Sequence, residues 1–219
     1  MNYKVQHIPV NKAKRPGKKI KTEYITIHST ANKRSTAQNE RDWLVNPSNN
    51  RSASWHIVVD EIEAIEAIPL DEIAYHAGST QGNSTSIGIE ICESGNRQKT
   101  LQNAVKLVAK MLYERNWGVN KLRRHFDWSG KNCPRILSYN NWAGWIKFKQ
   151  DVRKELDILK GVGKVANKKH WGEEYYNNLA KKGIKLTDKR YDDKITRAEA
   201  MALVDKATDR IIEMIKEDK

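Results

Sequence analysis

The 219-residue sequence is short of cysteine and of long apolar runs. Its two cysteines, Cys92 and Cys133, are too few for a disulfide framework, so we expect one inert thiol and one thiol with a chemical role. A membrane-spanning helix needs about 18 or more consecutive apolar residues, and no run of that length occurs. Residues 1–24 are charged and lack the apolar core of a secretory signal. We therefore expect synthesis in a cytoplasm without a signal peptide, and action on an extracellular target only after release.

Acidic residues are also in short supply relative to basic ones. The 27 Asp and Glu residues against 40 Lys and Arg leave a net charge of +13. Such an excess favours an anionic polymer as partner, through electrostatic steering and counterion release. Nucleic acids and the anionic polymers of Gram-positive walls both meet that description, and a solvated basic surface without a partner carries the same charge. Charge alone does not choose among these.

Alternating apolar and polar residues predict four strands in the first part of the chain. They cover residues 24–28, 55–60, 62–68 and 87–92. Ile25 and Ile27 share one face of the first strand, and Thr26 and His28 share the other. In the last strand Glu90 lies on the face opposite the isoleucines.

Apolar residues at helical spacing predict three helices among these strands and after them. They cover residues 36–46, 101–118 and 145–159. The first 22 residues are interpreted as a surface arm with at most a short strand near residues 5–8, and residues 119–141 as turn-rich.

The second part of the chain is small. Gly161-Val162-Gly163 is interpreted as a hinge, which places a first domain at residues 1–160 and a second at residues 161–219. In the second domain we expect two helices, the first ending at Gly183 and the second opening with a capping box of Thr196 and Glu199. Two helices of this size bury little apolar surface, so we expect docking onto the first domain or self-association.

The most unusual cluster of side chains is the turn-rich segment from His125 to Pro134. It holds an imidazole, the carboxylate of Asp127, the ammonium of Lys131 and the thiol of Cys133 within nine residues. A catalytic zinc ion takes three protein ligands and keeps one position open. The spacing of His125 and Cys133 suits a loop that folds around a metal. His28, at the end of a strand and on its polar face, is the best candidate for the third ligand.

Other interpretations of the same residues stay open at this point. A single histidine such as His28 is usually a hydrogen-bonded structural residue, and a cysteine such as Cys133 is usually a buried thiol. Cys133 and His125 also fit the nucleophile and base of a cysteine hydrolase, although Pro134 removes a backbone donor next to the thiol. A nucleic-acid-binding protein with structural zinc needs four ligands, and the sequence supplies no convincing pair of metal-binding motifs, so we expect no nucleic-acid partner.

Five motifs in order resemble one known family. They are Ile27-His28-Ser29-Thr30, Ser54-Trp55-His56-Ile57-Val58-Val59-Asp60, Tyr75-His76-Ala77-Gly78, Ser86-Ile87-Gly88-Ile89-Glu90 and the segment from His125 to Pro134. Over residues 20–157 the chain resembles the N-acetylmuramoyl-L-alanine amidases of the type-2 amidase family, which are related to peptidoglycan recognition proteins. The resemblance implies an α/β fold with a central mixed β-sheet flanked by helices. It also implies a single zinc ion held by His28, His125 and Cys133.

The resemblance further implies a reaction and roles for the neighbouring residues. The substrate is the amide between N-acetylmuramic acid and L-alanine of peptidoglycan, whose carbonyl zinc polarises. Glu90 is expected to act as general base and then to protonate the leaving amine, and Lys131 to stabilise the oxyanion. Asp127 is expected to orient a ligating histidine or to fix the loop, as carboxylates around metal sites do, and a turn-capping role is equally open.

Three further residues are expected to contact the substrate. His76 resembles a position at the rim of the cleft, and Trp55 and His56 lie on the neighbouring strand. In some relatives a tyrosine with a catalytic role stands at the position of Trp55. Tryptophan cannot transfer a proton in that way, so the burden of proton transfer shifts onto Glu90.

The tail resembles a single S-layer homology motif, which runs from His170-Trp171 to Ile195-Thr196-Arg197-Ala198-Glu199-Ala200. Such motifs bind secondary polymers of Gram-positive walls, generally in sets of three, so we expect wall binding that needs self-association or help from the first domain. A small helical appendage that stabilises the enzyme is the alternative. Together these features predict a phage endolysin that lyses a Gram-positive host. A bacterial autolysin with the same activity and a non-catalytic peptidoglycan recognition module are the alternatives.

Overall fold

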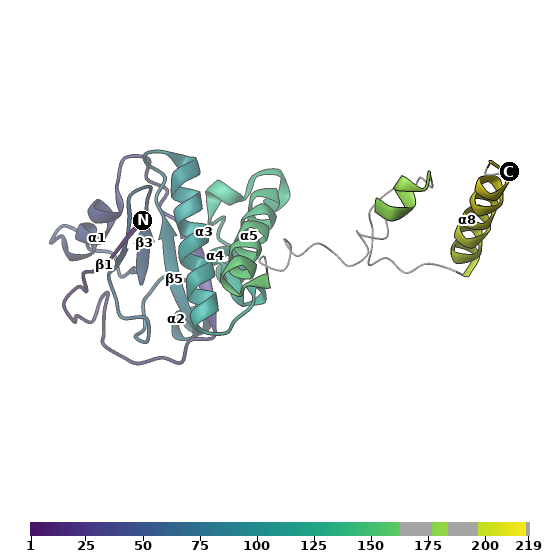
Figure 1. The fold of residues 1–219 in the computed structure, drawn as a ribbon. Coiled ribbons are helices and arrows are strands. Elements are labelled where there is room, and N and C mark those ends of the chain that lie inside the picture. Colours follow the sequence, from purple (N-terminus) through teal and green to yellow (C-terminus); the bar gives the residue numbers. More distant parts are fainter. Residues whose placement is uncertain (163–176, 184–196, 218–219) are drawn as a thin grey trace. The chain divides into compact units, whose positions relative to one another are not determined.

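The structure is a computed structural model that describes residues 1–162, 177–183 and 197–217 (Figure 1). The chain divides into two compact units, Met1–Val162 and Gly163–Lys219. The first unit carries all of the strands that the structure describes, and every residue expected to take part in chemistry belongs to it.

A six-stranded mixed sheet forms the centre of the first unit. Its strands are β1 (Asn2–Val5), β2 (Tyr24–Ser29), β3 (Ile57–Val59), β4 (Glu63–Glu66), β5 (Ser86–Ile91) and β6 (Leu122–Arg124). They lie in the order β1-β4-β3-β5-β2-β6, and all neighbours are parallel except the antiparallel hairpin of β3 and β4. The predicted mixed sheet is therefore confirmed. The short strand β6 was not expected, because its three residues show no clear alternation.

One face of the sheet is apolar and is covered by two long helices, α3 (Arg97–Glu114) and α5 (Tyr139–Leu159), which pack side by side. Ile25, Ile27, Ile87 and Ile89 point from the central strands into this core and are fully buried. The helical stripe with Leu107, Val108 and Leu112 on α3 covers them, together with an apolar stripe from Trp145 to Leu156 on α5. The alternation that predicted β2 and β5 thus reflects a real two-sided sheet.

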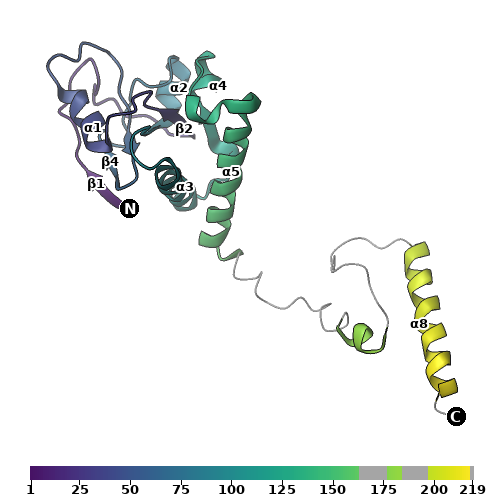
Figure 2. The same ribbon diagram turned by 90° about the horizontal axis from the view of Figure 1, so that it is seen from above.

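On the opposite face β2 and β5 carry the polar side chains of His28 and Glu90, whereas Val58 and Ile65 of the β3–β4 hairpin pack against Ala37. This face meets shorter helices: α1 (Ala37–Val45), α2 (Thr80–Thr85) and α4 (His125–Ser129) (Figure 2). Thr36 caps α1 with its side chain, and the helix ends before Pro47. Two single-turn 3-10 helices, η1 (Val119–Lys121) and η2 (Arg135–Leu137), lie on either side of β6 and α4. The region predicted to be turn-rich therefore contains regular but very short elements.

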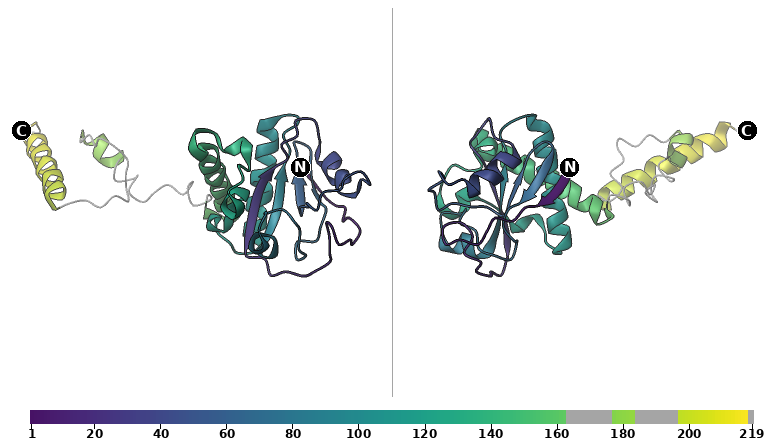
Figure 3. Two further views of the ribbon diagram at one scale, coloured as in Figure 1. Left: turned by 180° about the vertical axis from the view of Figure 1, so that it is seen from behind. Right: turned by 90° about the vertical axis from the view of Figure 1, so that its left-hand side faces the viewer.

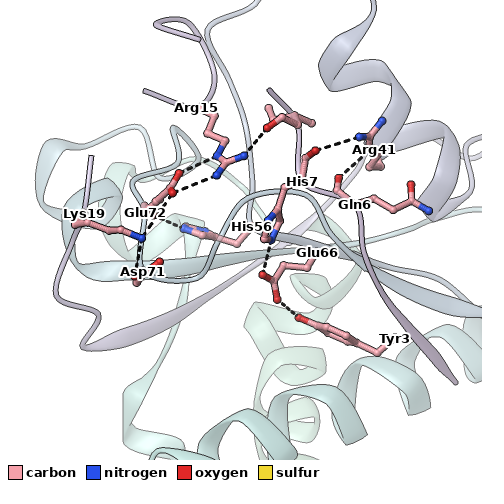
Figure 4. Close-up of polar contacts among 11 residues, drawn as sticks. Tyr3, Gln6, His7, Arg15, Lys19, Arg41, His56, Glu66, Asp71 and Glu72 are labelled. Carbon is pink, nitrogen blue, oxygen red and sulfur yellow. Dashed lines mark hydrogen bonds and ion pairs between the residues drawn. The ribbon is translucent and has the colours of Figure 1, made fainter. Parts of the chain in front are cut away.

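The N-terminal residues are bound to the domain instead of forming a loose arm. Strand β1 pairs with β4 at the edge of the sheet (Figure 3). Ile8 is fully buried, and the guanidinium of Arg15 binds the carboxylate of Glu72, with Arg15 Nε 2.8 Å from Glu72 Oε2 (Figure 4). Many charged residues suggested a solvated arm, but Lys4, Arg15 and Lys19 have acidic partners that lie far away in the sequence.

The second unit is described in two pieces. Residues 177–181 are helical and are followed by Gly183 in a left-handed conformation, which fits its predicted role as a stop signal. Helix α8 (Arg197–Glu217) carries Val204, Ile211 and Met214. The predicted capping residue Thr196 and most of the S-layer-like motif, including Trp171 and Tyr175, lie outside the described residues. No helix of the described parts of the chain is both long and apolar enough to cross a membrane.

Candidate metal centre

Three side chains expected to bind a metal meet on the polar face of the sheet. His28 lies near the end of β2, His125 is the first residue of α4, and Cys133 follows in the loop after that helix. Strand β6 pairs with β2 through Ile27 and Arg124, which places His125 beside His28 although the two are 97 residues apart. The tertiary pairing of a very short strand therefore assembles the cluster.

The geometry of the three side chains is that of a metal-type donor set. His28 Nδ1 lies 3.1 Å from His125 Nδ1 and 3.7 Å from Cys133 Sγ. One donor atom from each of the three residues lies within 4.8 Å of the others, and all three residues are buried. Two imidazole nitrogens and a thiol are ligands that zinc prefers. The residues present therefore fit a zinc ion.

The electrostatics of the cluster suit the same ion. Burial, and then the neighbouring histidines and Lys131, hold the pKa of His28 well below its ordinary value. Burial and then Lys131 lower the pKa of His125 to about 4, so both rings are neutral at neutral pH, as metal ligands must be. Burial raises the pKa of the Cys133 thiol to about 12. A thiol in this environment is deprotonated by a bound cation and not by the protein alone.

The raised pKa of Cys133 also bears on the alternative of a cysteine hydrolase. A nucleophilic cysteine needs a lowered pKa, generally from a nearby histidine cation. Here the thiol lies 3.7 Å from His28 Nδ1, and the neighbouring histidines are neutral. The surroundings of Cys133 favour a metal ligand over a nucleophile.

Glu90 lies next to the donor set on β5, directly opposite His28 in the sheet register. Its Oε1 is 4.0 Å from His28 Nδ1, and its buried Oε2 has no hydrogen-bond partner among the described residues. Burial, and then the neighbouring Glu40, raise its pKa to about 8. This value describes the site without a metal, in which Glu90 is mostly protonated at neutral pH. A cation held by the neighbouring donor set would lower the pKa, so that the carboxylate could accept a proton and return it.

The site opens into a large cleft with a cavity volume of about 1330 Å³. Lys131 is exposed and lines the cleft beside the donor set, close enough for its charge to lower the pKa of both His28 and His125. Trp55 also lines the cleft, and its buried Nε1 has no hydrogen-bond partner within the described ranges. Other wall residues are Asn39, Trp43, Arg51, Tyr75 and Arg135.

The structure does not support a substrate contact for His56, and for Asp127 it favours the turn-capping alternative over the orientation of a ligating histidine. His56 is fully buried, with its Nδ1 accepting from the Gly88 amide at 2.9 Å and its Nε2 2.8 Å from the Glu72 carbonyl (Figure 4). No substrate can reach it. Asp127 does not orient a ligating histidine, because its hydrogen bonds within the described part of the chain all go to Arg124. It closes the first turn of α4 and so fixes the helix that begins with His125.

His76 needs a different interpretation from a residue at the rim. It lines the cleft but is buried, and both of its ring nitrogens face protein groups. Its Nδ1 lies 3.0 Å from His28 Nε2, and its Nε2 lies 3.2 Å from the Ser86 carbonyl oxygen. The Nδ1 atom of His76 therefore faces His28, one of the three potential metal ligands, and not the open cleft.

Two acidic groups, Glu40 in the cleft wall and Glu93 behind Arg135, were not anticipated. Glu40 on α1 is buried and hydrogen-bonds the hydroxyl of Ser35, and Glu93 after β5 binds both the Ala31 amide and Arg135. No local pattern marks these residues, because their partners come from distant parts of the chain. Arg135 stands two residues after Cys133, and that proximity was the one available signal.

These features define an α/β protein in which three potential metal ligands line a large cleft. The family model described as N-acetylmuramoyl-L-alanine amidase matches residues 17–136, and the chain belongs to this type-2 amidase family. The amidase CwlA of Bacillus subtilis (strain 168) is 45% identical over 150 residues, which cover 65% of this chain and 53% of CwlA. The chain spans about half the length of the curated relatives it matches.

Solved structures give the same assignment. The catalytic domain of XlyA superposes with a TM-score of 0.64 at 37% identity, covering 69% of this chain and 99% of that domain. A mutant endolysin from Bacillus subtilis gives a TM-score of 0.64 at 38% identity, with the same coverage of 69% and 99%. The first unit of this chain is therefore similar to a complete catalytic domain.

Proposed function

We propose that this chain is a zinc-dependent amidase that hydrolyses the bond between N-acetylmuramic acid and L-alanine in bacterial peptidoglycan. One observation carries the proposal: in a member of the N-acetylmuramoyl-L-alanine amidase family, donor atoms of His28, His125 and Cys133 lie within 4.8 Å of one another beside a large cleft. Bound zinc would polarise the scissile carbonyl and acidify a water molecule there.

The chain's own residues supply the proton transfer and the charge stabilisation. Glu90, with one carboxylate oxygen unpartnered, takes a proton from the attacking water and returns it to the leaving amine. Lys131 presents its ammonium to the oxygen on which negative charge develops. Trp55 cannot exchange a proton, so in this proposal it contributes apolar surface to the cleft.

A digestion of Gram-positive cell walls tests the proposal. The protein is incubated with walls as purified, after a chelator, and after the chelator followed by zinc, and the newly exposed groups are identified. We expect new N-terminal alanine that disappears with chelation and returns with zinc. New reducing ends would indicate a glycosidase, and wall binding without release would indicate a recognition module.

The two cysteines provide a matched pair of variants for the same assay. Cys133→Ala removes a proposed zinc ligand, and Cys92→Ala removes a fully buried thiol that packs against Ala37, Val58 and Ile65. We expect the first variant to lose zinc and activity and the second to keep both. Activity that resists chelation but is abolished by thiol alkylation contradicts the zinc mechanism.

We further propose that the enzyme acts as an endolysin of Gram-positive bacteria, which is supported by its likeness to an endolysin of Bacillus subtilis. Purified protein is added to Gram-positive cells with permeabilised envelopes, and turbidity is followed. A fall in turbidity that chelation prevents is expected. Intact cells despite active digestion of isolated walls would contradict a lytic role and favour an autolysin with restricted access.

The second unit is proposed to bind anionic wall polymers, on the strength of its S-layer-like motif and of the excess basic charge of the chain. The first unit alone corresponds to a complete catalytic domain in XlyA, so it is expected to remain active without residues 163–219. Sedimentation with walls compares the full chain and the first unit. Equal binding by both would contradict the proposed role of the second unit.

A further inference from the structure

The His76 ring makes two hydrogen bonds, one to a backbone carbonyl and one to His28, and their donors and acceptors can be assigned. Its Nε2 lies 3.2 Å from the carbonyl oxygen of Ser86, which can only accept, so this nitrogen carries the proton. A neutral imidazole carries one proton, so His76 Nδ1 is a bare acceptor. That acceptor faces His28 Nε2 at 3.0 Å.

The direction of this bond fixes the proton on His28. Because His76 Nδ1 accepts, His28 Nε2 must donate, and the single proton of the neutral His28 ring is held there. His28 Nδ1 is then unprotonated. It is also the atom that lies 3.1 Å from His125 Nδ1 and 3.7 Å from Cys133 Sγ. The hydrogen-bond chain from Ser86 through His76 therefore presents the bare nitrogen of His28 to the donor set.

The backbone around His76 holds its ring in the place that this chain requires. A Cβ atom at Gly88 would lie 2.6 Å from His76 Cγ, so the ring packs against a strand position that only glycine leaves open. The side chain of Asn83 accepts from the backbone amides of His76 at 2.9 Å and of Ala77 at 2.8 Å. These contacts fix both the ring and the turn that carries it.

We propose that His76 is a positioning residue that sets the tautomer and orientation of the zinc ligand His28, and that it does not contact the substrate. The inference rests on the proposed zinc site. Groups that hold a ligating histidine through its far nitrogen typically change metal affinity by about 10- to 100-fold when they are removed.

Variants at His76 and His56 test this role. His76→Leu removes the acceptor but keeps apolar bulk, and His76→Asn keeps an acceptor oxygen near the position of Nδ1. His56→Leu is the matched control, because His56 is also a buried histidine and, among the described residues, its hydrogen bonds go to backbone groups of Gly88 and Glu72. Zinc affinity is measured by equilibrium competition with a chelator, and the visible spectrum of the cobalt-substituted protein reports the geometry of the ligands.

The expected result separates positioning from general loosening of the fold. His76→Leu should weaken zinc binding about 10- to 100-fold and alter the cobalt spectrum, and His76→Asn should restore affinity to within about threefold of wild type. His56→Leu should leave both measurements close to wild type even though it lowers thermal stability. Unchanged zinc affinity and cobalt spectrum in folded His76→Leu would overturn the proposal.

A measurement on the unmodified chain keeps the proposal testable if His76→Leu does not fold. In protein with ¹⁵N-labelled histidine and bound cadmium, His28 should be bonded to the metal through Nδ1 and carry its proton on Nε2. Metal on Nε2 of His28 would overturn the proposal. If the wild-type chain binds no zinc at all, the proposed function itself is wrong; if it binds zinc and releases alanine while His76→Leu behaves like wild type, only the role of His76 is wrong.

Discussion

The two faces of the central sheet are built on opposite physical principles. On one face, Ile25, Ile27 and Ile89 are fully buried against α3 and α5, and their contacts require only apolar shape. On the other face, His28 and Glu90 stand directly across from each other and are surrounded by polar side chains. The same two strands supply both sets.

The difference between the faces lies in how far each side chain depends on a particular neighbour. An isoleucine of the apolar face is stabilised by loss of water contact, and many neighbours provide that. His28 depends on particular atoms of His76, His125 and Cys133. Substitutions on the apolar face should therefore change stability, and substitutions on the polar face should change zinc binding or turnover. The following predictions test that separation, beginning with the largest effect.

Glu90→Ala, a substitution on the polar face, should abolish most of the turnover without unfolding the protein. Removal of the proposed general base should lower kcat by about 10²- to 10⁴-fold, because that is the usual contribution of a positioned base. Zinc content should stay near one ion per chain, since the donor set of His28, His125 and Cys133 is untouched. Release of N-terminal alanine from walls and metal analysis check the two parts. Near-normal turnover would show that another group is the base.

Leu112→Ala, a substitution in the core on the apolar face, should lower stability and leave turnover unchanged. Leu112 is fully buried in α3, so the loss of its side chain should lower the free energy of unfolding by about 2–5 kcal/mol. Turnover at a temperature where the variant is folded should stay close to wild type. Tyr113→Ala is the control, because Tyr113, the next residue on the helix, is 48% exposed, and its loss should cost about 0.5 kcal/mol or less. Denaturant titration measures both variants.

Lys131→Met should lower turnover by about 10²-fold while zinc affinity and stability remain close to wild type. The reason is that Lys131 is exposed at the cleft and its proposed contribution exists only when charge develops on the substrate. Lys110→Met, which alters an exposed ammonium on α3, is the control and should be neutral. If both variants behave alike, Lys131 has no special part in the reaction.

His56 provides the smallest and most specific test, through pH. Burial lowers its pKa to about 4, whereas an unfolded chain has a histidine pKa of about 6.5. Between about pH 6.5 and pH 4, His56 is therefore protonated in the unfolded chain and neutral in the folded protein. The stability that His56 contributes is complete above about pH 6.5 and is lost as pH falls, by about 1.4 kcal/mol per pH unit.

The comparison of wild type with His56→Leu isolates this effect. In metal-free protein, the difference between their free energies of unfolding should shrink steadily as pH is lowered from 7 to 5. The variant lacks the titrating ring, so acid-sensitive groups that do not interact with His56 contribute equally to both proteins. A difference that does not change with pH would mean that His56 is protonated in the folded state or is not buried.

Site residues could be predicted where a local sequence pattern places them, and not where contacts with distant residues do. His28 on the polar face of its strand and Cys133 in a chemical cluster could be anticipated, because their positions follow from alternation and from spacing in the sequence. The burial of His56 could not, and for Asp127 the sequence left two roles open. His56 is buried and forms hydrogen bonds with the backbone of Gly88 and Glu72. Asp127 accepts hydrogen bonds from Arg124 at the start of α4, a helix that no apolar periodicity predicted.

The acidic residues Glu40 and Glu93 illustrate the same limit. No local sequence pattern marks either residue. Glu40 is bound by Ser35 and Glu93 by Arg135, and only the folded structure shows these partners. The N-terminal residues were misjudged for a related reason. Their basic side chains resemble a solvated surface until the acidic partner Glu72 is known.

The sequence by itself determined which residues face the core, because burial of apolar side chains imposes the periods of strand and helix on the chain. It also determined the inventory of chemical groups and, through ordered motifs, the family. The tertiary structure decided how those groups are used. Only the pairing of β6 with β2 brings His125 to His28, and only the packing of Gly88 against His76 lines up the hydrogen bond that directs His28. Such directional contacts join residues far apart in the chain, and no local pattern records them.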